Sequence, residues 1–160
     1  MKEAFPPVIS PNARILILGT MPSELSLKRQ EYYGNPLNKF WHIMQAVFDV
    51  PADGTYAERI AGLQHNNIAI WDVLHSCDRV GSLDSAIKNA IPNDFAGLFA
   101  SLPELQVIAF NGKKASEWFE RWALVDSSHF QKLVLPSTSP AAAMAFEKKV
   151  AAWRKLKGMG

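Results

Sequence analysis

The sequence has little cysteine, no long apolar run and little net charge, and each shortage excludes a class of protein. Cys77 is the single cysteine, which excludes an internal disulfide framework and any multi-cysteine metal site and suits a reducing cytoplasm. Apolar runs such as residues 15–18 are far shorter than the roughly 18 residues of a membrane-spanning helix. The first residues carry an early acid and no apolar signal core, so we expect a cytoplasmic protein. The net charge of +2, from 17 basic and 15 acidic residues, argues on its face against a strongly electrostatic nucleic-acid binder.

What is present is the composition of a globular domain. Hydrophobic residues make up 48% of the 160 residues and charged residues 20%, which is enough to bury a sizeable core. There is no repeat, low-complexity tract or long linker, so residues 1–160 are expected to form one domain. Five tryptophans and nine phenylalanines are a generous supply of flat side chains, either for the core or for stacking on a ligand.

Short apolar runs alternate with amphipathic stretches along the chain. Such runs, apolar on both faces, are typical of strands in a parallel sheet that helices cover on both sides. The alternation therefore predicts an open α/β sheet, in which ligands bind beyond the carboxyl ends of the strands. The predicted strands are residues 15–18, 67–71, 107–110 and 132–135, and the predicted helices are residues 40–48, 56–64, 93–100, 113–122 and 140–157. The last helix would begin with Ser139 as N-cap and Pro140 in its first turn.

Unusual residues follow the first predicted strand. The turn at residues 19–22, Gly-Thr-Met-Pro, either brings the backbone close to a ligand or is an ordinary connection between strand and helix. Residues 30–41 then contain four aromatics, two asparagines, a glycine and a proline. Helical periodicity does not account for these aromatics, which form either a packed loop or a binding surface.

Polar groups also follow the third and fourth strands. Asn111 offers donors and an acceptor that suit the edge of a base or an amide, although it could also cap the next helix. Residues 135–140, Leu-Pro-Ser-Thr-Ser-Pro, place hydroxyls between two prolines just before the predicted last helix. This loop suits a phosphate bound at a helix N-terminus, or it is simply a capping loop.

Other candidates are weaker. The four histidines show no metal-ligand spacing, and Cys77 is most simply structural. Asp72 and His75 follow the second strand and could act as acid–base groups, but Asp72 could equally cap a turn. The sequence has no Gly-x-Gly-x-x-Gly, P-loop or Gly-x-Ser-x-Gly motif, which disfavours nucleotide-cofactor enzymes and hydrolases with a nucleophile elbow.

Two stretches resemble motifs of the uracil-DNA glycosylase superfamily. The first joins residues 19–22 to residues 33–41 (Tyr-Gly-Asn-Pro-Leu-Asn-Lys-Phe-Trp), and the second is residues 135–140. Residues 110–113 are similar to the end of the family's third strand. The mismatch-specific uracil/thymine glycosylases share the opening and the ending of the first motif, but they hold the hydrolytic water with an asparagine where this chain has Met21. Met21, the Tyr-Tyr pair and the Ser-Thr-Ser-Pro motif are more similar to the hypoxanthine-DNA glycosylase branch, in which a later asparagine takes over that task.

The resemblance implies a fold, a reaction and a set of site residues. The fold would be a three-layer α/β/α domain around a four-stranded, mostly parallel sheet. The protein would be a monomeric, monofunctional DNA glycosylase that flips a deaminated or mismatched base out of double-stranded DNA and hydrolyses its glycosidic bond without metal or cofactor. Hypoxanthine would be the first substrate, with uracil or thymine in mispairs second. Asn38 would be catalytic, Gly19, Thr20, Met21, Pro22, Tyr33 and Asn111 would bind the base, and Ser137, Thr138, Ser139 and Pro140 would bind DNA.

Two other hypotheses stay open at this point. Because a thioether cannot orient water, Met21 also fits a catalytically silent module that binds nucleic acid or a nucleotide. A small α/β enzyme acting on a free nucleoside would cleave inosine itself and would show no salt-sensitive binding to DNA.

The charged residues are unevenly distributed along the chain, so the net charge alone understates the capacity to bind DNA. Basic residues gather near the proposed DNA-facing motifs, while most acids lie elsewhere, so we expect moderate DNA affinity with a shallow salt dependence. The basic residues concerned are Lys28, Arg29, Lys39, Lys113, Lys114, Lys148, Lys149, Arg154, Lys155 and Lys157.

Overall fold

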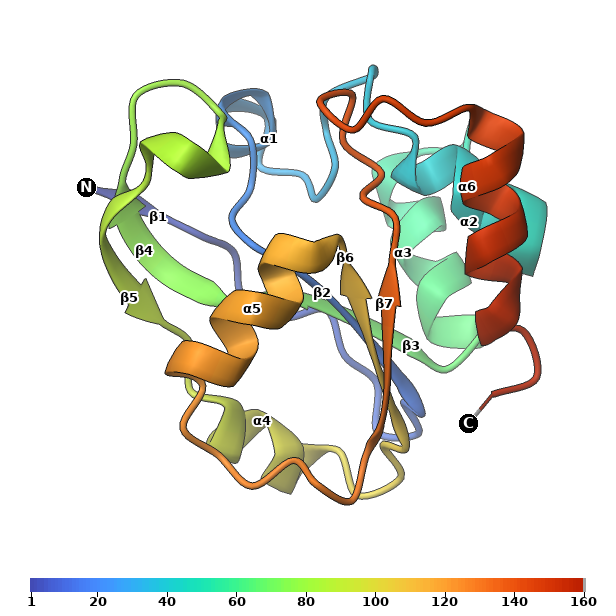
Figure 1. Ribbon diagram of the computed structural model, residues 1–160. Coiled ribbons are helices and arrows are strands. Elements are labelled where there is room, and N and C mark those ends of the chain that lie inside the picture. Colours follow the sequence, from blue (N-terminus) through green and yellow to red (C-terminus); the bar gives the residue numbers. More distant parts are fainter. Residues whose placement is uncertain (160) are drawn as a thin grey trace.

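The computed structural model describes residues 1–159, and a four-stranded parallel sheet lies at its centre (Figure 1). The strands are β2 (Ile15–Gly19), β3 (Ile68–Asp72), β6 (Val107–Asn111) and β7 (Gln131–Leu135), in the order β3–β2–β6–β7. All neighbouring pairs are parallel, and each strand begins and ends within one residue of its prediction. The strands β2, β3 and β6 are buried along their whole length, which explains their continuous apolar runs.

Helices cover both faces of this sheet and form two separate cores (Figure 1). Helices α2 (Phe40–Phe48), α3 (Tyr56–His65) and α6 (Phe146–Trp153) pack on the face that carries Ile15 and Ile17. Helices α4 (Phe95–Ser101) and α5 (Lys113–Trp122) pack on the face that carries Leu16 and Leu18. The predicted three-layer α/β/α fold is therefore confirmed.

A second, smaller sheet lies beside the first and was not predicted. Its strands are β1 (Lys2–Glu3), β4 (Leu74–Asp78) and β5 (Lys88–Pro92), paired antiparallel in the order β1–β4–β5. Register shifts interrupt the β4–β5 ladder, so these segments lack the regular alternation that would predict strands. The short helix α1 (Glu24–Arg29) and the 3₁₀ turns η1 (Asp84–Ala86) and η2 (Arg154–Leu156) complete the described elements. Within residues 1–159 no helix has the length and apolar character needed to cross a membrane.

The predicted helix over residues 140–157 is wrong in its first part. Helix α6 begins only at Phe146. Ser139 Oγ does accept a hydrogen bond from the backbone N–H of Ala141, but the bond closes a turn and does not start a helix. Within the predicted range, Ala143 is exposed, whereas Val150 and Trp153 are buried. Tertiary packing therefore begins at Phe146 and decides where the helix starts.

Candidate active site

The carboxyl ends of the central strands surround a cavity of about 510 Å³. A volume of this size lies within the range of small-molecule binding sites. All eleven site residues predicted from the sequence line it, although they come from three separate parts of the chain. They are Gly19, Thr20, Met21, Pro22, Tyr33, Asn38, Asn111, Ser137, Thr138, Ser139 and Pro140. The structure thus brings the predicted residues together at one place, while their individual roles stay predictions.

The loop after β2 is held by hydrogen bonds to the small sheet and its connections. The carbonyls of Gly19 and Thr20 accept hydrogen bonds from the N–H groups of Val73 and Leu74. Thr20 Oγ1 donates to Asp84 Oδ1 at 3.0 Å, and Arg79 Nη2 donates to the carbonyl of Pro22. Met21, which follows Thr20, is buried and forms part of the cavity wall.

Tyr33 lies at the end of a strained loop and forms another wall of the cavity. Its φ is +53°, in the left-handed region that a residue with a bulky side chain rarely adopts. One face of its ring stacks on Phe40, with the ring centroids 3.9 Å apart and the planes 13° apart. Its hydroxyl accepts a hydrogen bond from Asn111 Nδ2 at 3.2 Å. These contacts fix the ring at the edge of the cavity.

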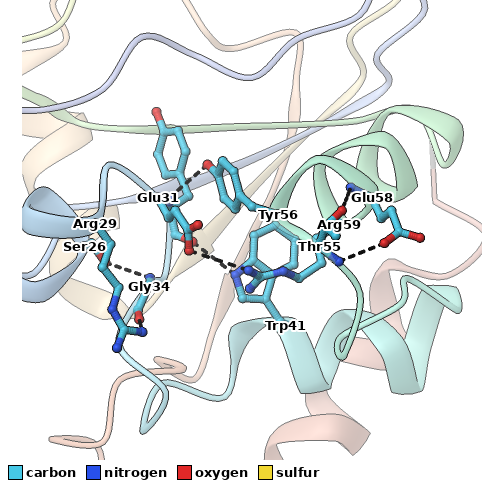
Figure 2. A network of polar contacts seen from close by, with 10 residues as sticks. Ser26, Arg29, Glu31, Gly34, Trp41, Thr55, Tyr56, Glu58 and Arg59 are labelled. Carbon is cyan, nitrogen blue, oxygen red and sulfur yellow. Dashed lines mark hydrogen bonds and ion pairs between the residues drawn. The ribbon is translucent and has the colours of Figure 1, made fainter.

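Helix α3 braces the same loop from outside (Figure 2). The hydroxyl of Tyr56 accepts a hydrogen bond from the backbone N–H of Tyr32, and Trp41 Nε1 donates to the Tyr32 carbonyl. Arg59 lies over the rings of Trp41 and Tyr56 and forms an ion pair with Glu31 at 3.6 Å. After Tyr33, the N–H of Gly34 donates to Ser26 Oγ and its carbonyl accepts from Arg29 Nη1, so the loop is anchored on both sides of its strained residue.

The side chain of Asn38 is oriented by the start of helix α2. Its Oδ1 accepts a hydrogen bond from the backbone N–H of Phe40 at 2.9 Å, which closes an Asx turn just before the helix, whose N-cap is Lys39. The side chain is half-buried and lines the cavity. Its Nδ2 makes no hydrogen bond to any residue in the range 1–159. The amide is therefore held in place with hydrogen-bonding capacity left for a ligand or water.

Asn111 is engaged within the protein in this structure. Its Nδ2 donates to Tyr33 Oη and to Thr138 Oγ1, and its Oδ1 accepts from the backbone N–H of Thr138. Both N–H groups of the amide are thus used in joining the ends of β6 and β7 to Tyr33. A hydrogen bond from Asn111 to a base stays a prediction. For Nδ2 to donate to a base, Asn111 would have to give up its bond to Tyr33 Oη or to Thr138 Oγ1.

The loop at residues 136–142 is tied to helix α6 by two side chains. Lys149 Nζ donates to the carbonyl of Ser139 at 3.2 Å, and Trp153 Nε1 donates to the carbonyl of Pro136 at 2.9 Å. Lys149 is buried, and this burial lowers its pKa. The expected contribution of a helix N-terminus to phosphate binding is not found here, because α6 begins at Phe146 and not beside Ser139.

Asp72, which the sequence offered either as an acid–base group or as the cap of a turn, lies at the cavity. It ends β3 directly beside Gly19 of β2, is 4% exposed and lines the cavity. Burial, reinforced by the nearby carboxyl of Asp84, raises the pKa of Asp72 to about 7, and Arg79 opposes this shift. Its place at the carboxyl end of a buried strand was the available signal. His75, the other acid–base candidate, is exposed and does not line the cavity.

We also searched residues 1–159 for side chains that could bind a metal ion together. Within residues 1–159 no group of three or more His, Cys, Asp or Glu side chains is placed to hold a metal ion. That the reaction needs no cofactor stays a prediction.

Comparison with known proteins identifies the family. The sequence profile of the Uracil DNA glycosylase superfamily matches residues 6–157. The chain therefore belongs to the uracil-DNA glycosylase superfamily, which confirms the resemblance and the predicted class of DNA glycosylase.

Two similar proteins and one similar solved structure come from the genus Methanosarcina. A hypoxanthine DNA glycosylase of Methanosarcina acetivorans is 39% identical over 154 residues, which cover 96% of each chain. A hypoxanthine DNA glycosylase of Methanosarcina barkeri is 35% identical over 156 residues, 92% of this chain and 99% of the relative. A solution NMR structure of a candidate uracil DNA glycosylase from M. acetivorans has a TM-score of 0.84 at 38% identity, and the match covers 97% of this chain and 95% of that one.

Proposed function

We propose that this chain excises hypoxanthine from double-stranded DNA by hydrolysing the glycosidic bond and leaving an abasic site for base excision repair. The observation that carries the proposal is that every residue predicted from the superfamily motifs lines one cavity. The two hypoxanthine DNA glycosylases, similar over nearly the full length of this chain, favour hypoxanthine over the other deaminated bases.

The target base would leave the duplex and enter the cavity between Met21 and Tyr33. Extrusion costs a few kcal/mol and is least unfavourable at a mispair, which favours deaminated bases. Contact with an aromatic ring offsets about 1–3 kcal/mol of this. One face of Tyr33 is already covered by Phe40, so the base would contact the part of the ring that lines the cavity.

Asn38 would position the water that attacks the sugar. A neutral carboxamide is not a base at physiological pH, so its contribution is orientation and not proton removal. The bond between Oδ1 and the N–H of Phe40 supports this role, because it fixes the plane of the amide and leaves Nδ2 for the water or the sugar. Met21 cannot orient water, which leaves this task to Asn38 in the first motif.

The loop at residues 137–140 would contact the phosphates beside the flipped nucleotide. Hydroxyl groups and backbone N–H groups are common phosphate ligands in complexes with DNA. Ser137 and Ser139 are partly exposed on the cavity wall, whereas Thr138 is buried and holds the loop to Asn111. Lys39 and Lys113 are exposed residues that flank the same wall, where they would add positive charge.

A base-excision assay tests the proposal. Duplexes of one sequence context would carry a single deoxyinosine, deoxyuridine, deoxyxanthosine or mispaired thymidine in a labelled strand, and abasic sites would be cleaved with alkali. We expect the highest single-turnover rate for deoxyinosine. Asn38→Ala should lower the rate by about 10²-fold or more, the usual loss for one preorganised polar group at a reacting centre.

The matched control is Asn12→Ala, which removes an exposed asparagine in a turn outside the cavity and should leave the rate unchanged. Excision of uracil or thymine in preference to hypoxanthine would contradict the proposed substrate. Unchanged excision in Asn38→Ala would contradict the role of Asn38.

A further inference from the structure

We propose that Asp72 is a second catalytic residue, which donates a proton to the base as it leaves the sugar. This inference rests on the proposed function, since it assigns a step in the same reaction to a residue that the superfamily motifs of this chain do not include.

The position of Asp72 places its carboxyl group at the cavity, next to the loop that receives the base. It ends β3, and its register partner on β2 is Gly19, the first residue of that loop. A Cβ atom at Gly19 would lie 2.6 Å from Asp72 Oδ1 and 3.1 Å from Tyr33 Oη. The missing side chain of Gly19 therefore leaves the carboxyl group and the Tyr33 hydroxyl facing the same space.

One oxygen of this carboxyl group has no partner. Asp72 is 4% exposed, and its Oδ2 is buried without a hydrogen bond to any residue in the range 1–159. An unpaired buried carboxylate oxygen is costly, so such groups are expected to serve a function or to carry a proton. The unpaired Oδ2 belongs to a residue that lines the cavity.

The groups around Asp72 favour its protonated form. Burial first, and then the carboxyl of Asp84 on η1, raise the pKa of the Asp72 carboxyl, and the guanidinium of Arg79 after β4 opposes them, which leaves the pKa at about 7. The phenols of Tyr32 and Tyr33 also face Asp72, and their own pKa values are raised by burial first and by Asp72 second. Asp72 is thus balanced near neutrality, where a general acid is most effective.

The chemistry of the departing base requires such a donor. As the bond between N9 and C1′ breaks, its electron pair moves onto the purine, and an ionised carboxylate in the same cavity would repel the charge that develops. A neutral Asp72 gives its proton to a ring nitrogen of the purine, so the base leaves uncharged. Water adds to C1′ and loses its proton to solvent. Asp72 remains as a carboxylate near Arg79, whose Nε and Nη1 have no hydrogen-bond partner within residues 1–159, and regains a proton after the base is released.

The pH dependence of excision separates this role from others. Single-turnover rates on the deoxyinosine duplex would be measured between pH 5 and pH 9 for the wild type, Asp72→Asn and the exposed-carboxylate control Asp53→Asn, with the carboxyl ¹³C resonance of Asp72 titrated in parallel. For the wild type and the control we expect a rate that falls about tenfold per pH unit above the titration midpoint of Asp72. Asp72→Asn should be slower by about 10²–10⁴-fold at pH 6 and should lose this dependence.

Two results would overturn the inference while the proposed function stands. One is a wild-type rate that rises with pH through the Asp72 midpoint, which would mean that the ionised form is active. The other is an Asp72→Asn variant with the wild-type pH profile, even if its rate is lower, because a structural role would scale the rate without changing its titration. If the wild type excises no hypoxanthine at any pH, the proposed function fails and this inference fails with it.

Discussion

Asn38 performs two tasks with one side chain, and the tasks can be separated by substitution. Its Oδ1 accepts the N–H of Phe40, the first residue of helix α2, while the side chain lines the cavity. A serine hydroxyl can accept a backbone N–H in the same kind of turn, but it lacks the reach and the N–H groups of the amide.

We therefore expect Asn38→Ser to keep the unfolding free energy within a few tenths of a kcal/mol of the wild type, whereas Asn38→Ala loses about 1 kcal/mol with this hydrogen bond. Both variants should lose excision activity to the same extent. Urea unfolding and single-turnover assays on the same preparations would check this. Activity that follows this hydrogen bond, and so survives in Asn38→Ser, would mean that the residue acts only through helix α2.

The raised pKa of Asp72 predicts how the unfolding free energy depends on pH, which can be measured without substrate. Its folded pKa of about 7 lies above its ordinary value of 3.8, so the folded chain binds this proton more tightly than the unfolded chain. The resulting stabilisation is complete below about pH 4 and is lost as the pH rises through about 7.

Replacing Asp72 with Asn removes this titration. The unfolding free energy of Asp72→Asn minus that of the wild type should therefore be larger at pH 8 than at pH 4, by up to about 4 kcal/mol. Urea unfolding at the two pH values measures the difference, with Asp53→Asn as the exposed control. An equal offset at both pH values would show that folding does not shift the pKa of Asp72.

The residues of the site were predictable from the sequence to different degrees. Gly19, Tyr33 and Asn38 stand in motifs that resemble those of the superfamily, so their place at the cavity could be predicted. Asp72 could be named as an acid–base candidate but not preferred over a turn-capping residue, because only the pairing with β2 shows that it lies beside Gly19. For Asn111, the position was predictable but not its hydrogen bonds to Tyr33 and Thr138, which depend on distant parts of the chain.

At the scale of elements, helix α3 supports the site without touching the cavity. The Tyr56 hydroxyl accepts the N–H of Tyr32, next to the strained Tyr33 (Figure 2). Tyr56→Phe would leave that N–H without its partner at little change in shape, which typically costs about 1–3 kcal/mol.

We expect Tyr56→Phe to be less stable by that amount, and to excise hypoxanthine more slowly without a change in the pH profile, since the ring of Tyr33 is less well held. Thr55→Ser, which retains the capping hydroxyl at the start of α3, is the control and should leave both properties unchanged. The unfolding free energy and the single-turnover rate are the two readouts. Full activity in a destabilised Tyr56→Phe would mean that Tyr33 does not depend on this brace.

The elements themselves were predictable where burial is continuous and local signals agree. The central strands are apolar on both faces, and α5 carries a regular stripe, so both were located within a residue. The start of α6 was misplaced because residues 139–145 have helical composition but no core to pack against. Strands β4 and β5 were not predicted, because their shifted register removes the alternation of buried and exposed residues that is typical of a strand.

For the whole molecule, the distribution of charge matters more than its sum. Lys39, Lys113 and Lys114 are exposed next to residues that line the cavity. Burial raises the pKa of Asp84, and Lys114 is one of the nearby groups that oppose this shift. If these three lysines contact phosphates, the logarithm of DNA affinity should fall with the logarithm of salt concentration with a slope of about −3.

Lys39→Ala should reduce the magnitude of this slope by about one. Lys132→Ala removes the same charge at the start of β7, the end of the sheet opposite the cavity, and should leave the slope unchanged. Fluorescence anisotropy of a labelled duplex at several salt concentrations gives both slopes. Equal slopes for the two variants would show that Lys39 contacts no phosphate.

The central claim is that this chain hydrolyses the bond between hypoxanthine and deoxyribose in DNA. The most direct test is a single-turnover reaction on a deoxyinosine duplex in H₂¹⁸O, with the base and the DNA strand analysed by mass spectrometry. The account predicts free hypoxanthine together with an uncleaved strand whose abasic sugar carries ¹⁸O at C1′, and neither product in Asn38→Ser. An intact deoxyinosine strand, or a strand cleaved at the sugar through a covalent enzyme intermediate, would contradict it.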